Sequence, residues 1–204
     1  MPTTIETENY WTNRYKDEST GWDIGYPSTA LKEYIDQLTD KNIRILIPGA
    51  GNAYEAEYLM GLGFNNVFVM DISAIPLQNF ASRNTNFPKA QLIEGNFFEH
   101  KGKYDLIIEQ TFFCSFEPTK ENRNAYANQM AALLNPNGKL VGVWFNIPLV
   151  EGNMDKRPFG GSKEEYLEYL TPYFTVKTFE PCYNSIESRA GQELFGIMVK
   201  DNDA

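Results

Sequence analysis

Residues 43–59 read IRILIPGAGNAYEAEYL, and this stretch decides the fold. Residues 43–47 are apolar and rich in β-branched side chains, which predicts a buried strand, and residues 53–62 have the period of a helix. Between them, Gly49 and Gly51 form a Gly-x-Gly turn. A strand, a glycine turn and a helix in this order are typical of the first unit of a parallel α/β sheet.

The turn lacks a feature that a dinucleotide-binding loop usually has. Such a loop carries a third glycine, here at position 54, which lets the pyrophosphate approach the start of the helix. That position is Tyr54. The loop also has no Gly-Lys-Ser/Thr, which excludes a nucleoside-triphosphate loop. A bare turn of this kind can be purely structural, so its meaning depends on the rest of the chain.

Further apolar runs alternate with amphipathic segments along the chain. We expect more strands at residues 67–70, 91–94, 104–108, 140–145, 174–179 and 194–199, and helices at residues 73–84, 120–134 and 162–170. Because no helix separates the last two strands, they should form an antiparallel edge pair. The pattern predicts an α/β fold in a single domain, residues 1–204, with a mostly parallel sheet and helices on both faces.

Three local signals mark the ends of the expected helices. Ser73 can cap the helix that follows the second strand. Ser162 begins SKEE, which reads as a capping box with Glu165 three residues later. The sequence NPNG at residues 135–138 should end the preceding helix and turn the chain.

Composition narrows the classes of partner. The 204 residues carry a net charge of −9 and no Lys/Arg cluster, which argues against nucleic acid and anionic membranes and favours a small-molecule ligand. No apolar run could span a bilayer, and the polar N-terminus does not resemble a signal peptide. Cys114 and Cys182 are expected to be reduced thiols of a cytoplasmic protein, and a monomer is the default. The single histidine, His100, is expected in a solvated loop, so we predict no metal site.

Polar residues at the expected strand ends turn the glycine loop into a candidate ligand site. Asp71 comes 20 positions after Gly51, at the end of the second strand, where an acidic residue can accept hydrogen bonds from ribose hydroxyls. A ligand that contains adenosine but no pyrophosphate would use both features, which indicates S-adenosylmethionine (SAM). Asn96 and Phe97 could contact adenine, and Glu109 and Gln110 end the fourth strand, where they should face the cleft.

Other interpretations remain at this point. The glycines could simply form a tight turn with Asp71 capping the next helix, and Phe97 could belong to the core. The chain could also bind SAM without transferring its methyl group, act on another small acceptor, or be a dinucleotide-dependent oxidoreductase, which Tyr54 disfavours.

Several stretches, which cover most of the chain, resemble the thiopurine S-methyltransferase family of SAM-dependent methyltransferases. They are similar in particular to its halide/thiol methyltransferase branch and bacterial relatives. The matching stretches include YWTNRYKDESTGWDIGYPSTAL, ILIPGAGNAYEAEYL, VFVMDIS, EGNFFEH, YDLIIEQTFFCSFEP, LLNPNGKLVGVWF, RPF and SRAGQELFG. The resemblance implies a Rossmann-like, seven-stranded class I methyltransferase sheet, with residues 1–36 as an N-terminal lid segment.

The resemblance also implies roles for single residues. Trp11 and Trp22 would cover the SAM site from the lid, with Gly49 and Gly51 under the methionine part. Asp71 would hold the ribose, Asn96 and Phe97 would contact the adenine, and Ile72 would be a further cofactor-binding residue. Glu109 and Gln110 would border the methyl group, followed by Thr111, and Arg189 would stand near the acceptor. The bound product would be S-adenosylhomocysteine (SAH).

The acceptor is predicted less directly than the cofactor. A thiolate, hydrosulfide or halide needs little help from a strong base, since thiol pKa values lie near about 8.5. Asp23, Tyr26 and Glu109 are the candidate proton acceptors near the cleft. The family's GGPPF motif reads DKRPFGG here, and its usual Asp-Tyr reads Glu109-Gln110. We therefore predict methyl transfer to a small thiol or thiopurine-like compound, or to halide or hydrosulfide.

Overall fold

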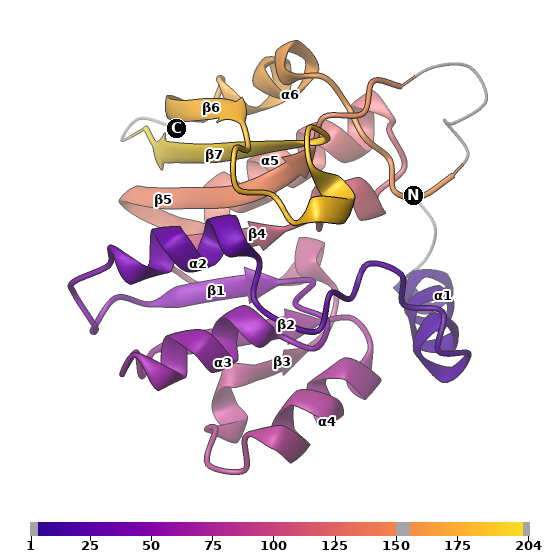
Figure 1. The fold of residues 1–204 in the computed structure, drawn as a ribbon, viewed down its shortest axis with the longest axis vertical. Helices are drawn as coiled ribbons and strands as arrows, with labels where there is room; N and C mark the ends of the chain where they lie inside the picture. Colours follow the sequence, from indigo (N-terminus) through magenta and orange to yellow (C-terminus); the bar gives the residue numbers. More distant parts are fainter. Residues whose placement is uncertain (1–3, 150–155, 202–204) are drawn as a thin grey trace.

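The computed structural model describes residues 4–149 and 156–201. In this part of the chain, seven strands form one sheet in the order β3-β2-β1-β4-β5-β7-β6 (Figure 1). Strands β1 to β5 run parallel, whereas β7 is antiparallel to both of its neighbours, β5 and β6. The bounds are β1 Ile45–Pro48, β2 Val67–Asp71, β3 Leu92–Glu94, β4 Tyr104–Gln110, β5 Leu134–Phe145, β6 Phe174–Pro181 and β7 Glu193–Lys200. This topology confirms the predicted α/β fold and the antiparallel C-terminal pair.

Helices cover both faces of the sheet. They are α1 Thr4–Lys16, α2 Thr29–Asp36, α3 Tyr54–Gly61, α4 Ala74–Arg83, α5 Lys120–Leu133 and α6 Lys163–Leu170, with short 3₁₀ turns η1 Lys89–Gln91, η2 Phe97–Glu99, η3 Phe113–Ser115 and η4 Glu187–Arg189. Side chains of β1 alternate between two buried clusters: Ile45 and Ile47 pack with α2, α3 and α4, and Leu46 packs with α5 and α6. Successive strand residues point to opposite faces, so β1 is buried on both sides.

The local signals at helix ends are largely confirmed. Ser73 caps α4 by accepting from Ile75 N, and Ser162 caps α6 by accepting from Glu165 N. The capping box is only half formed, however, because the Glu165 side chain pairs with Arg123 instead of returning to the cap.

The helix before the NPNG segment ends as predicted, at Leu133, but the start of the next strand was predicted too late. The NPNG segment does not separate α5 from a later strand, since β5 begins at Leu134, directly after the helix. Tyr104 pairs with Leu134 and Leu106 with Lys139, so the residues between bulge out of the ladder. A turn signal inside a paired segment thus produces a bulge, because the flanking apolar residues are still held by β4.

The N-terminal segment is more regular than the sequence suggested. It contains α1 and α2, which the apolar pattern did not predict, and α1 lies at the edge of the sheet where β1 and β4 end (Figure 1). Thr12 Oγ1 lies 2.9 Å from Ser73 Oγ and ties α1 to the start of α4. None of the helices in the described residues is long and apolar enough to cross a membrane.

The cysteines and the histidine are all partly or fully covered. Cys114 and Cys182 are buried free thiols, as predicted. His100 is not a fully solvated loop residue, because its Nε2 lies 2.8 Å from Tyr104 Oη. Burial lowers its pKa from the ordinary histidine value.

Candidate active site at the carboxyl ends of the strands

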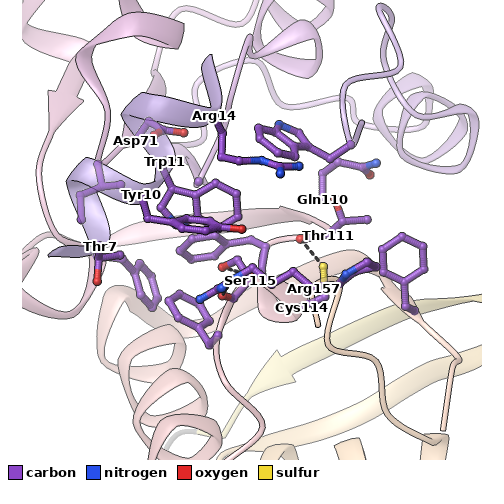
Figure 2. A pocket seen from close by; sticks show the side chains of 18 of the residues that line it. Thr7, Tyr10, Trp11, Arg14, Asp71, Gln110, Thr111, Cys114, Ser115 and Arg157 are labelled. Carbon is purple, nitrogen blue, oxygen red and sulfur yellow. Dashed lines mark hydrogen bonds between the residues drawn. The ribbon is translucent and has the colours of Figure 1, made fainter. Parts of the chain in front are cut away.

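A cavity of about 640 Å³ lies where the parallel strands end. Its walls come from α1, from the loops after β1, β2, β3, β4 and β5, and from the segment around η4. Figure 2 shows side chains from these elements pointing toward one another. In an open α/β sheet this edge is the expected place for a ligand. The volume is within the range of about 300–1,000 Å³ that is typical of small-molecule sites.

The two glycines of the first loop make room for aromatic rings. A Cβ on Gly49 would lie 2.0 Å from Cδ2 of Phe112, and one on Gly51 would lie 3.0 Å from Oη of Tyr15. Both glycines have positive φ, 57° and 53° respectively, which disfavours any side chain. The loop therefore lets the cavity be covered closely by Phe112 from one side and by the lid from the other.

Asp71 at the end of β2 holds the glycine loop in place. Its Oδ2 accepts from Gly51 N at 3.0 Å and its Oδ1 accepts from Ser73 N at 2.9 Å. Burial raises its pKa to about 6, against the opposing effect of these backbone hydrogen bonds. Each carboxylate oxygen can accept a second hydrogen bond. Asp71 lines the cavity, so its carboxylate is open to a hydrogen bond from a ligand hydroxyl there.

The residues expected at the adenine end lie together in the cavity wall. Ile72, Asn96 and Phe97 all line it. The Asn96 side chain also caps η2, accepting from Phe98 N at 3.1 Å and donating to Glu99 Oε1 at 3.1 Å. The Phe97 ring packs edge-on against Phe98, with centroids 5.3 Å apart. Asn96 therefore shapes this end of the cavity through the turn it stabilises.

The N-terminal segment expected to form the lid brings an aromatic cluster and one cation to the cavity. The Trp22 ring meets Trp11 and Tyr15 at centroid distances of 5.3 and 5.6 Å. The guanidinium carbon of Arg14 lies 5.5 Å from the centre of the Trp22 ring. Arg14 Nε is buried and has no hydrogen-bond acceptor among the described residues. A buried donor without a partner is costly, so an acceptor supplied by a ligand at this place would offset that cost.

The sequence predicted that Glu109 faces the cleft, but the structure places it elsewhere. It is fully buried and lines neither the large cavity nor the small hollow beside it. Its Oε1 accepts from Phe112 N at 2.6 Å and from Phe113 N at 2.7 Å, while burial raises its pKa to about 8. Successive strand residues alternate in direction, so Gln110 rather than Glu109 reaches the cavity, and Thr111 follows it there. Glu109 is thus a positioning residue for the turn after β4.

Two other predicted proton acceptors also lie outside the large cavity. Asp23 accepts from Gly25 N at 2.8 Å and from the Asn52 side chain, and it lines the small hollow under the lid. Tyr26 lines that hollow as well and is 49% exposed. Asp23 is held by lid and loop contacts that a sequence pattern does not reveal. It fastens the lid to the glycine loop rather than standing at the large cavity.

Arg189 does reach the large cavity. Its Nη2 donates to Trp22 O at 2.9 Å and its Nη1 lies 3.4 Å from Glu193 Oε1. Its guanidinium carbon also lies 5.3 Å from the centre of the Phe145 ring. Arg189 therefore joins the C-terminal segment to the lid across the cavity.

Several cavity residues were missed by the sequence reading. They include Tyr10, Arg14 and Tyr15 from α1, Phe112, Ser115 and Phe116 after β4, and Arg157 before Pro158. A signal existed for the first group, because Trp11, Arg14 and Tyr15 are spaced to share one face of a helix. The others come from loops, whose side-chain directions follow no simple period.

The sheet order, the glycine loop and Asp71 together define a SAM-dependent methyltransferase of the class I, Rossmann-like type. Solved structures agree on the fold. One described as "Conversion of a Disulfide Bond into a Thioacetal Group during Echinomycin Biosynthesis" has a TM-score of 0.74 and 16% identity, over 97% of this chain and 93% of that chain. Magnesium protoporphyrin IX methyltransferase from Synechocystis, with bound SAM, has a TM-score of 0.71 and 14% identity, over 98% of both chains.

Sequence comparison gives the family. The model of thiopurine S-methyltransferase (TPMT) matches residues 6–203, and the chain belongs to this family. It is 30% identical to probable thiol methyltransferase 2 of Arabidopsis thaliana, over 94% of this chain and 85% of that protein. It is 29% identical to thiocyanate methyltransferase 1 of Brassica oleracea, over 99% of this chain and 89% of that protein.

Proposed function

We propose that this protein transfers the methyl group of SAM to the sulfur of a small thiol or thiopurine-like compound, with halide or hydrosulfide as close variants. The observation that carries the proposal is that one cavity combines a glycine loop and a carboxylate with a wall of aromatic rings. The side over β1 and β2 offers the glycine loop and Asp71, and the side over β4 and β5 is walled by Phe112, Phe116 and Phe145. The names of the plant relatives support sulfur as the acceptor atom.

The described side chains fit the parts of SAM. Asp71 would accept from the ribose, and Phe97 would cover the adenine beside Asn96. Arg14 lies over the Trp22 ring, and Nε1 of that ring lies 3.9 Å from the position that a Cβ on Gly51 would take. Arg14 is therefore near the glycine loop, where its unpartnered Nε would donate to the carboxylate of the methionine part. Bound there, SAM would supply the methyl group. The thiolate sulfur would form a bond to the methyl carbon while the bond from that carbon to the sulfonium sulfur breaks. The electron pair of the broken bond would stay on the cofactor sulfur.

The protein's own contribution would be alignment and exclusion of water. Orientation of two reactants can contribute about 7–11 kcal/mol in favourable cases. Aromatic rings around the acceptor would strip water from a soft anion and raise its reactivity. Water would take the thiol proton, since a thiol with a pKa of about 8.5 is partly ionised at neutral pH. We expect a cytoplasmic monomer without a metal.

Incubation with methyl-labelled SAM and a panel of thiols, iodide and hydrosulfide tests the proposal. We expect the labelled methyl thioether of the thiol and one equivalent of SAH for each methyl group transferred. Calorimetry with SAM and NAD run side by side provides the control for cofactor choice. SAM binding without transfer to any acceptor of the panel would contradict the proposed reaction.

A further inference from the structure

Three arginines line the cavity, and they differ in what holds them. Arg189 is already bonded to Trp22 O and lies beside the Glu193 carboxylate. Arg14 lies at the methionine end of the proposed SAM site. Arg157 lies away from Arg14, next to Ser115 and Cys114 (Figure 2). Arg157 is therefore a cation on the acceptor side of the cavity. Methyl transfer to a neutral thiol would give this cation no role.

Arg157 is exposed, and its contacts with the described residues orient the guanidinium while leaving both Nη groups without a protein acceptor among them. Its Nε donates to Ser115 O at 2.8 Å, and its guanidinium carbon lies 4.5 Å from the centre of the Tyr10 ring and 5.1 Å from that of Phe159. In the described residues no ion pair involves Arg157, and neither Nη atom donates to a protein acceptor. The two Nη groups form a planar fork that matches a carboxylate.

The surroundings of Arg157 suit a ligand with an apolar body. Phe116, next to Ser115, packs against Phe112 and Phe98 at centroid distances of 4.8 and 5.1 Å. These rings line the same cavity as Arg157. Glu117 also lines the cavity, and its charge would disfavour an anionic group placed next to it. An apolar slot with a cation at one side recognises an amphipathic molecule.

We propose that Arg157 binds a carboxylate of the methyl acceptor, so that the substrates are small organic thiols that also carry a carboxylate. This inference rests on the proposed thiol methylation and adds the second group by which the acceptor is recognised. The carboxylate would fix the molecule at the rim while its sulfur reaches the methyl group. Arg157 is a specificity-determining residue in this arrangement.

The test uses two thiols with one skeleton, 2-mercaptobenzoate and benzenethiol. SAH formation gives kcat/KM for each with the wild-type protein, Arg157→Gln, Arg157→Lys and Arg44→Gln. Arg44 is a matched control, because its Nε also donates to a main-chain oxygen, Lys103 O at 3.1 Å, and its guanidinium carbon lies 4.5 Å from the Phe68 ring centre. It directly precedes β1, at the opposite end of the sheet.

We expect Arg157→Gln to lower the ratio of kcat/KM for 2-mercaptobenzoate over benzenethiol by about 10-fold or more, as loss of a charge-assisted hydrogen bond implies. The change should appear in KM, be partly restored in Arg157→Lys, and be absent in Arg44→Gln. Comparing ratios between variants cancels the intrinsic reactivity of each thiol. An unchanged ratio in Arg157→Gln would overturn the inference while thiol methylation stands.

A binding experiment separates the two proposals. Calorimetry measures 2-(methylthio)benzoate binding to the SAH complex of each variant. Binding that Arg157→Gln weakens about 10-fold supports the inference even if none of the thiols is methylated, a result that would refute only the proposed reaction. Binding that is equal in wild type and Arg157→Gln refutes the inference whatever the turnover.

Discussion

On the side of β1 and β2, the glycine turn and the carboxylate under the lid come from short stretches at strand ends, whereas the side of β4 and β5 depends on contacts between distant segments. On the first side, Gly49, Gly51 and Asp71 lie within 23 positions of one another in the sequence. On the second, Tyr10 of α1 meets Arg157 from the loop after β5. Local motifs therefore identify the glycine loop and Asp71, whereas the lid contacts above them and the acceptor side form only on folding. The following changes test this difference.

Gly49→Ala should have the largest effect. A Cβ would fall 2.0 Å from Phe112, in a residue with φ of 57°. Left-handed strain and overpacking together cost about 2–5 kcal/mol of unfolding free energy, and SAM affinity should fall about 100-fold as Phe112 is displaced. Urea unfolding and calorimetry measure both. Gly63→Ala is the control, because Gly63 has a φ of 87° but a Cβ there would have nothing within 4 Å, so this variant measures backbone strain alone. Equal losses of unfolding free energy in the two variants would contradict the packing argument.

Glu109→Ala should be the next most damaging change. It leaves the N–H groups of Phe112 and Phe113 without their acceptor, which costs about 2–4 kcal/mol for two partly or fully buried groups. Glu109→Gln keeps one acceptor oxygen and should lose much less. Urea unfolding of both variants at pH 7 provides the comparison.

The same residue predicts a pH dependence of stability. The folded pKa of Glu109, about 8, lies above its ordinary value of 4.5, so the folded state holds the proton more tightly. Its stabilising contribution is therefore complete below pH 4.5 and falls as the pH rises to about 8. Glu109→Gln should flatten this slope. A slope as steep as that of the wild type would show that other groups cause it.

Asp71→Asn should weaken SAM binding by about 10-fold, since one charged acceptor for the ribose is lost. The pKa of Asp71, about 6 in the wild type, also predicts the direction of a pH effect. The affinity for SAM should rise as the pH increases through 6, because the ionised carboxylate is the better hydrogen-bond acceptor. Calorimetry from pH 5 to pH 8 should find this rise in the wild type and a smaller one in the variant. Affinity that falls over this range would contradict the ribose contact.

Arg14→Gln should have the smallest effect on the protein and a selective one on the ligand. We expect the ratio of affinities for SAM and decarboxylated SAM to drop about 10-fold, since only SAM has the carboxylate. Lys16→Gln, an exposed cation on the same helix, is the control. A drop of equal size for both ligands would mean that Arg14 acts through the packing of Trp22 instead.

The sequence alone determined the order of strands and helices after residue 43, because apolar periodicity and helix caps act over a few neighbouring residues. It also placed Gly49, Asp71 and Gln110 at the cavity, since parallel strands bring their carboxyl ends to one edge. The direction of Glu109 was wrong, because it depends on which hydrogen-bond donors surround the carboxylate after folding, and the expected role of Asp23 as a proton acceptor stays a prediction. Tertiary structure alone decided that the glycines admit Phe112 and Tyr15, and that Tyr10 and Arg157 meet, since these contacts join segments that share no local pattern.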